Sequence, residues 1–224
     1  SPDGNYIMIT TIQKPFSYIV PLNRFPSKTV VYDLEGKEVK VVNQVPLNEI
    51  MPKGFMATRT GKRNMNWRND EAATLYFVEA LDEGNPENKV DYRDIVMQWK
   101  APFYQEPTEL LKTKQRFGGI IWGNSTDRNS QDIYSDPGNY ETTKNKFGKN
   151  VLAIEDNHLF LLGNGFTKNG QFPFIDEFNL ASLQTKRLYT STYKDKKEDL
   201  LSIEDFKKGE VLVQIQSKNE YPNY

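Results

Sequence analysis

The chain has 224 residues, and its 29 lysine and arginine residues nearly balance 30 aspartate and glutamate residues, for a net charge of -1. This balance gives no electrostatic footprint for nucleic acid or an anionic membrane, so we expect neither as a partner. The lack of cysteine excludes disulfides and thiolate metal sites, and no apolar run approaches the roughly 20 residues that cross a bilayer.

The first predicted elements are a turn and the strand that follows it. Residues 1–4, SPDG, combine a proline that presets φ with a glycine that permits positive φ, and β-branched and aromatic residues dominate positions 5–10. A strand pair is predicted next, at residues 29–32 and 37–42, with a turn at 33–36 between the strands.

The same turn-and-strand phrase returns along the chain. It recurs as NWRNDEAATLYFVEA at residues 66–80, opens again as GGIIWGNST at Gly118, and ends as IEDFKKGEVLVQIQS at residues 203–217. Strand pairs follow two of these copies, at residues 93–113 and 174–191. One weak helix signal covers residues 199–207.

A unit of four strands that recurs every few tens of residues is typical of a β-propeller blade. We therefore predict an all-β fold, a partial β-propeller of repeated four-stranded antiparallel blades, with about four to five blades over residues 1–224. Trp67 and Trp122 are 55 positions apart, more than the ~40–50 residues of a compact blade, so some loops must be long. A β-sandwich with a similar number of strands is the competing fold.

The residues give little sign of catalysis. His158 is the single histidine, there is no G-x-S-x-G motif, and we expect His158 to be an ordinary surface or strand-edge residue. No calcium-loop or phosphate-loop pattern is present, so we expect no metal and no cofactor. A chain that opens on the first turn of a blade is expected to be part of a longer propeller.

The repeated phrases resemble the propeller domains of the prolyl oligopeptidase family, and the glutamyl endopeptidase branch in particular. The resemblance is carried by QKPFSYIVPLNRFPSKTVVYDLEGKEV, by GKRNMNWRNDEAATLYFVEA, and by the shorter DYRDIV, IYSDPG and QSKNEYPNY. It implies a serine endopeptidase whose α/β-hydrolase domain, with the Ser, Asp and His, follows the propeller and is absent from these 224 residues. The propeller portion would gate substrate access and help to bind the peptide substrate, and would be inactive alone. The resemblance also suggests an exported or periplasmic bacterial protein.

One departure from the branch pattern lies after GGIIWGNST. The pattern continues with a further strand pair before IYSDPG, whereas this sequence runs through DRNSQD directly into Ile133. We expect roughly one hairpin to be missing at the Thr126–Asp127 join; a truly short blade is the alternative.

Four cationic residues are candidates for binding substrate. A peptidase that cleaves after glutamate needs a cation for that side chain, and arginine offers a bidentate fork. Arg24 is the first candidate, with Lys14, where the branch pattern has arginine, at the other end of the apolar loop PFSYIVPLNRFP. Arg59, Lys62 and Arg63 form the second cationic cluster, whose two arginines are the further candidates. For each of the four, the alternative is a solvated charge or a surface ion pair of little energetic value.

A second function remains open from the sequence. A propeller of the TolB or WD-repeat kind would present a face to a protein partner and carry no catalysis. An incomplete propeller also exposes blade faces, which makes self-association an expectation. A hydrolase domain encoded beyond Tyr224 would favour the peptidase.

Overall fold

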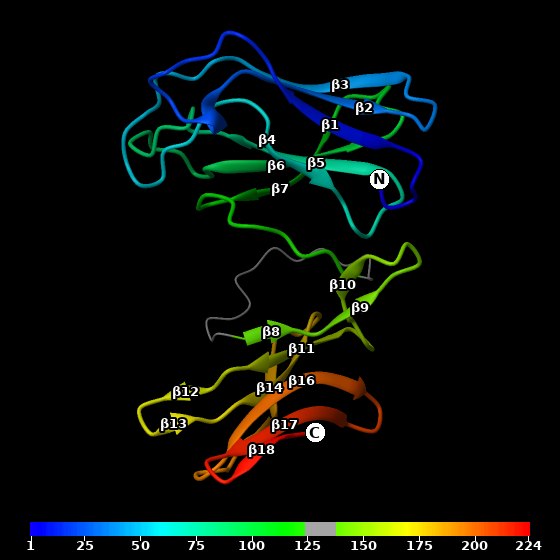
Figure 1. Cartoon of the computed structure of the whole chain (residues 1–224), viewed down its shortest axis with the longest axis vertical. Helices are drawn as coiled ribbons and strands as arrows, with labels where there is room; N and C mark the ends of the chain where they lie inside the picture. The colour runs from blue at the N-terminus through cyan, green and yellow to red at the C-terminus, as the bar shows by residue number, and fades with distance from the viewer. Residues whose placement is uncertain (124–137) are drawn as a thin grey trace. The chain divides into compact units, whose positions relative to one another are not determined.

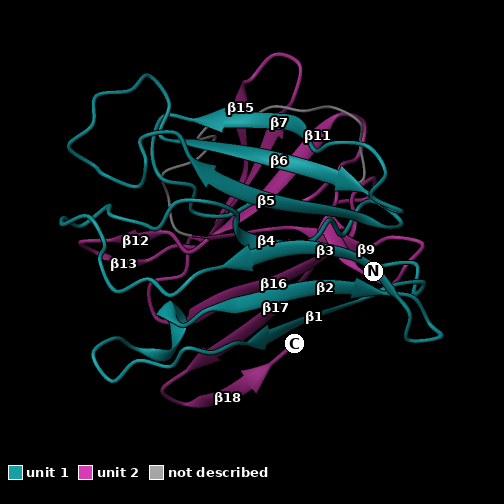
Figure 2. Cartoon of the chain, turned by 90° about the horizontal axis from the view of Figure 1, so that it is seen from above, with its two compact units in different colours: residues 1–120 teal, residues 121–224 magenta. Residues whose placement is uncertain are grey.

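The computed structural model describes residues 1–123 and 138–224, which form two compact units, residues 1–120 and 121–224 (Figures 1 and 2). The predicted all-β class is confirmed: the described residues contain antiparallel sheets, no α-helix, and one 3-10 turn at Leu22–Arg24. None of these elements is a helix long and apolar enough to cross a membrane.

Unit 1 begins with a three-stranded antiparallel sheet in the order β1-β2-β3. Its strands are β1 (Ile7–Ile12), β2 (Ser27–Tyr32) and β3 (Glu38–Val45). The predicted turn between β2 and β3 is present: the Asp33 carboxylate accepts a hydrogen bond from the Lys37 amide at 2.8 Å, and Gly36 has a φ of 81°. The strand pair predicted from the sequence is thus confirmed.

The second sheet of unit 1 has four antiparallel strands in chain order, β4-β5-β6-β7. They are β4 (Arg63–Trp67), β5 (Thr74–Ala80), β6 (Asp94–Lys100) and β7 (Thr108–Thr113). The central strand β5 is apolar on both faces, because Leu75 and Phe77 point one way while Val78 points the other, and all three are buried.

The core of unit 1 lies between its two sheets. Val31 and Val42 from the first sheet pack in one cluster with Leu75, Phe77 and Trp99 from the second and with Phe103 from the β6–β7 connection. The two turn phrases also meet, because the Asp3 amide donates to the Ala72 carbonyl at 3.1 Å and the rings of Tyr6 and Trp67 stack with centroids 6.5 Å apart.

Unit 2 contains two larger sheets. One has four strands in the order β15-β14-β11-β8, and the other has three in the order β16-β17-β18. The strands are β8 (Gly138–Tyr140), β11 (His158–Gly163), β14 (Phe174–Asn179), β15 (Thr185–Thr190), β16 (Lys197–Asp205), β17 (Glu210–Ser217) and β18 (Glu220–Asn223). Two small ladders pair β9 (Thr142–Lys144) with β10 (Asn150–Leu152) and β12 (Phe166–Thr167) with β13 (Gly170–Gln171).

The helix signal at residues 199–207 was wrong. Most of this segment belongs to β16, which pairs antiparallel with β17 through partners such as Leu200 and Val213. The acidic and lysine residues favour a helix locally, but the ladder with β17 overrides that weak preference.

Three further features expected from the sequence have different outcomes. His158 opens β11 half-buried, as expected of a strand-edge residue; its Nδ1 donates to the Asp156 carbonyl at 2.8 Å and its Nε2 accepts from Asn179 at 2.9 Å. The join at Thr126–Asp127 lies outside the described residues, so the missing hairpin stays a prediction. The repeat of blades also stays a prediction.

Candidate functional site

Two loops of unit 1 carry the predicted cationic residues. The loop between β1 and β2 is closed at its base by a hydrogen bond from the Gln13 amide to the Pro26 carbonyl at 2.8 Å. It meets the loop between β3 and β4, where the Asn48 amide donates to the Arg24 carbonyl at 3.0 Å and Ser17 Oγ donates to Glu49 at 2.9 Å. Residues more than twenty positions apart in the sequence therefore form one surface.

Arg24 and Lys14 lie on the first of these loops with their charges unpaired. Arg24 ends the 3-10 turn and is half-buried, and Lys14 is exposed near the base of the loop. Across the described part of the chain, neither side chain forms an ion pair. Both cations are therefore open to an anionic ligand.

Arg59 lies on the second loop and lines a small cavity of about 170 Å³, together with Asn48 and Glu83. Its guanidinium donates to the carbonyls of Thr60 at 3.1 Å and Lys62 at 2.5 Å. Burial lowers the pKa of Arg59, and the charge of Arg63 lowers it further. Both terminal nitrogens of this guanidinium thus bond backbone carbonyls of the β3–β4 loop.

Arg63 points into the protein instead. It is on β4, its side chain is only 10% exposed, and its Nη2 forms an ion pair with the fully buried Asp94. The pair lacks hydrogen-bond geometry, which leaves Nε and Nη2 of Arg63 without a hydrogen-bond acceptor. The structure therefore does not bring the four predicted cations together. Arg63 is held by a buried carboxylate, whereas the other three lie on the two loops.

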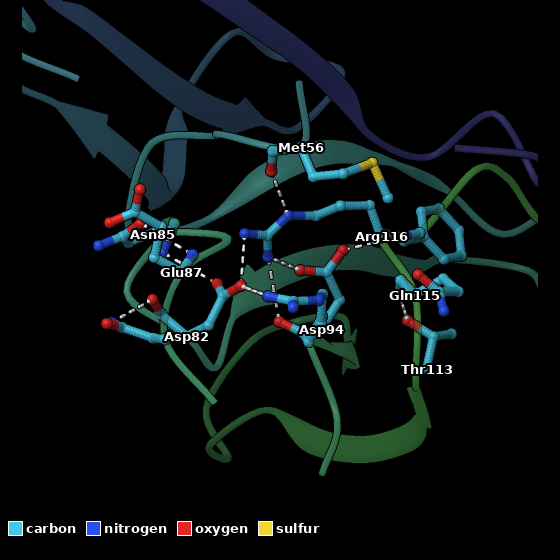
Figure 3. Close-up of polar contacts among 12 residues, drawn as sticks. Met56, Asp82, Asn85, Glu87, Asp94, Thr113, Gln115 and Arg116 are labelled. Carbon is cyan, nitrogen blue, oxygen red and sulfur yellow. Dashed lines mark hydrogen bonds and ion pairs between the residues drawn. The ribbon is translucent and has the colours of Figure 1, made fainter. Parts of the chain in front are cut away.

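An ionic network that sequence reasoning missed surrounds Asp94 (Figure 3). Arg116 donates to Asp82 at 2.6 Å and to Asp94 at 2.9 Å, and Arg93 donates to Asp82 at 2.8 Å. Both carboxylates are fully buried. Burial raises the pKa of Asp82, but hydrogen bonds from Arg116 and Arg93 outweigh it, so the pKa lies below its usual value.

The network holds the loop that carries Arg59. Arg116 Nε donates to the Met56 carbonyl at 2.7 Å (Figure 3). Two residues further on, the Thr58 amide donates to the Gly84 carbonyl at 3.0 Å. Arg116 is therefore a positioning residue for this loop. The sequence holds no signal for it beyond isolated charges, because its partners are 22 to 60 positions away.

Apolar side chains of the same two loops face solvent. Tyr18 and Phe55 are fully exposed, Ile50 is 91% exposed, and Phe16 is 58% exposed although it stacks on Phe25 at 5.8 Å between ring centroids. Exposed apolar groups gathered on two adjoining loops are typical of surfaces that contact another molecule or domain.

Among the described residues, the structure groups no three histidine, aspartate or glutamate side chains that could hold a metal ion.

Comparison with known proteins finds two similar sequences. No family model matches the chain. A protein named "Probable glutamyl endopeptidase, chloroplastic" from Oryza sativa subsp. japonica is 31% identical over 274 positions, and one of the same name from Arabidopsis thaliana is 30% identical over 275. Both alignments cover the whole chain, which spans 29% and 28% of those proteins. The similarity supports a peptidase-related family.

The alignments are also longer than the chain. An alignment of 274 positions contains at least 50 more than the 224 residues available to fill it. Each relative therefore carries segments within the aligned region that have no counterpart here.

Proposed function

We propose that this chain is the non-catalytic β-propeller portion of a serine peptidase of the prolyl oligopeptidase family, similar to the glutamyl endopeptidases. The observation that carries the proposal is the similarity to two proteins named as probable glutamyl endopeptidases. The similarity covers the whole of this chain but less than a third of each relative. The all-β fold of the described residues is compatible with a β-propeller portion of a longer peptidase chain.

The sheets of unit 1 support the propeller. The strands follow each turn phrase in the same order: β1, β2 and β3 follow the turn at residues 1–4, and β5, β6 and β7 follow the turn at residues 67–70. Both sets are antiparallel in chain order, and they pack face to face through one core. Neighbouring propeller blades pack in this way, because each sheet must cover its apolar faces with another sheet.

The two joined loops support a role in gating and substrate binding. Arg24 offers an unpaired guanidinium, which can hold a glutamate side chain through two hydrogen bonds. Lys14 adds positive charge at the base of the same loop, and Arg59 borders the adjoining cavity. The exposed Tyr18, Ile50 and Phe55 supply an apolar surface for an α/β-hydrolase domain of the same protein.

Substitution of Arg24 in the full-length enzyme tests the proposal. Arg24→Ala should raise KM for a peptide with glutamate at the cleavage site by about 10- to 100-fold, the equivalent of one lost charged hydrogen bond, with kcat little changed. A glutamine substrate should be affected far less. Lys37→Ala, which removes an exposed charge from the β2–β3 turn, is the matched control. An unchanged kcat/KM for the glutamate substrate would contradict the role of Arg24.

The exposed apolar loops also fit a second function, a protein-interaction propeller of the TolB or WD-repeat kind. The gene decides between the two. A G-x-S-x-G-containing domain encoded after Tyr224 supports the peptidase, whereas a stop codon there supports the interaction module.

A further inference from the structure

Unit 2 contains a second, larger cavity of about 480 Å³, far from the loops described above in sequence. It lies between the sheet that contains β11, β14 and β15 and the sheet that contains β16 and β17. Phe160 and Ile175 line it from the first sheet, and Leu200 and Val213 line it from the second. Its volume falls in the range of small-molecule sites, roughly 300–1,000 Å³.

A β-bulge in β15 shapes one wall of this cavity. Ile175 pairs with Tyr189, but the next residue of β14, Asp176, pairs with Arg187, so Leu188 has no partner across the ladder. The extra residue lets the consecutive side chains of Leu188 and Tyr189 both line the cavity. Both are also partly exposed, at 46% and 38%, so the cavity opens to solvent along β15.

One carboxylate lies in this apolar setting. Glu198 is only 5% exposed and lines the cavity, and its Oε2 accepts a hydrogen bond from the Tyr189 hydroxyl at 2.9 Å. No lysine or arginine among the described residues pairs with Glu198. By contrast, the next acidic residue on the strand, Asp199, pairs with Lys197 at 2.6 Å.

Tyr189 supplies a hydrogen bond to Glu198 but no positive charge. Burial, followed by the hydrogen bond to Glu198, raises the pKa of Tyr189 to about 12. The phenol therefore stays a neutral donor at physiological pH and places no cation beside Glu198. A buried carboxylate without a cationic partner is costly, and such groups are usually paired.

We propose that this cavity binds a small hydrophobic cation, a primary ammonium on an apolar body, with the ammonium paired to Glu198. The apolar body would lie among Phe160, Phe206 and Val213. The rings of Phe160 and Phe206 lie 4.8 Å apart and supply an aromatic surface for that body. All residues of this site belong to unit 2, whereas the residues proposed to bind the peptide substrate, Arg24, Lys14 and Arg59, belong to unit 1.

Calorimetric titration of the purified 224-residue chain tests the proposal. The three ligands each carry a phenyl ring on a short alkyl chain and differ in the charge of the terminal group. Phenethylamine should bind saturably with one molecule per chain. The neutral 2-phenylethanol should bind at least tenfold more weakly, and the anionic 3-phenylpropionate should not bind. A blocked lysine, N-acetyl-lysine methylamide, shows whether the site also takes an ammonium attached to a peptide.

Two matched variants connect the binding to Glu198. Glu198→Gln should weaken phenethylamine binding at least tenfold and leave 2-phenylethanol unchanged, because only the charge is lost. Asp199→Asn, which removes the neighbouring charge, should leave both ligands unchanged. Equal amine binding by the Glu198→Gln protein, or no saturable amine binding by the unmodified chain, would overturn the proposal.

A third variant covers the case in which Glu198→Gln does not fold. Val213 lies opposite Leu200 on the cavity wall, so Val213→Phe should fill the space and abolish binding of both the amine and the alcohol. Circular dichroism confirms the fold of each variant. Unchanged amine affinity in a folded Val213→Phe protein would show that the ligand binds elsewhere.

Discussion

At the residue scale, Gly84 has no side chain, and this allows the loop that carries Arg59 to pack directly against its backbone. Its φ is +76°, and a Cβ built there would lie 2.0 Å from the Thr58 carbonyl oxygen. Backbone from two segments 26 positions apart is therefore in direct contact at this point. Any side chain must push the loop away from the turn that contains Gly84.

Gly84→Ala should lower the free energy of unfolding by more than the cost of placing alanine at a positive φ. Gly36→Ala is the matched control, because Gly36 has a φ of +81° with nothing within 4 Å of the added Cβ. We expect the control to cost about 1 kcal/mol in the free energy of unfolding, and Gly84→Ala to cost about 2–4 kcal/mol because a backbone clash is added. Urea denaturation measures both. Equal losses would show that the loop moves aside without cost.

At the element scale, the network around Arg116 joins the β5–β6 connection, β6 and the β3–β4 loop. Arg116→Met should lower the free energy of unfolding by about 3–5 kcal/mol, because it leaves Asp82 and Asp94 buried with fewer cations. Lys28→Met, which removes the exposed ion pair with Glu38, should cost less than about 1 kcal/mol. A loss for Arg116→Met as small as that of the control would contradict a stabilising network.

The same network predicts how stability depends on pH. The pKa of Asp82 is lower in the folded chain than its ordinary value of about 3.9. The stabilisation is therefore fully present above about pH 4 and is lost as the pH falls through the folded-state pKa. Asp82→Asn should be less stable at neutral pH and lose less stability between pH 5 and 2, as measured by denaturation at each pH. Parallel pH curves for the two proteins would assign the acid sensitivity to other groups.

At the scale of the whole molecule, the position of the one histidine predicts that these 224 residues have no peptidase activity. A serine peptidase needs a histidine base beside an exposed nucleophile, but both ring nitrogens of His158 are engaged by Asp156 and Asn179. The purified chain should not cleave a glutamate-containing fluorogenic peptide. Activity that disappears in His158→Ala would contradict this prediction; activity that persists there would identify a contaminant.

The sequence by itself predicted much of the strand structure. Turn signals such as Asp33-Leu34-Glu35-Gly36 and the alternation of apolar residues depend on neighbours a few positions away, so the strand pairs at β2–β3 and β14–β15 were expected correctly. The helix signal at residues 199–207 failed because the pairing partner β17 is a tertiary contact that local preference does not contain.

The candidate sites were decided by tertiary structure. Four cations looked alike in the sequence, yet folding left Arg24 and Lys14 unpaired, used Arg59 to hold a loop, and paired Arg63 with Asp94. The cavity at Glu198 was likewise invisible, because its walls come from two sheets and a bulge. Alternation and turn chemistry act over a few residues, whereas tertiary contacts join distant ones, such as Arg116 and the Met56 carbonyl, 60 positions apart, and only the packed sheets bring them together.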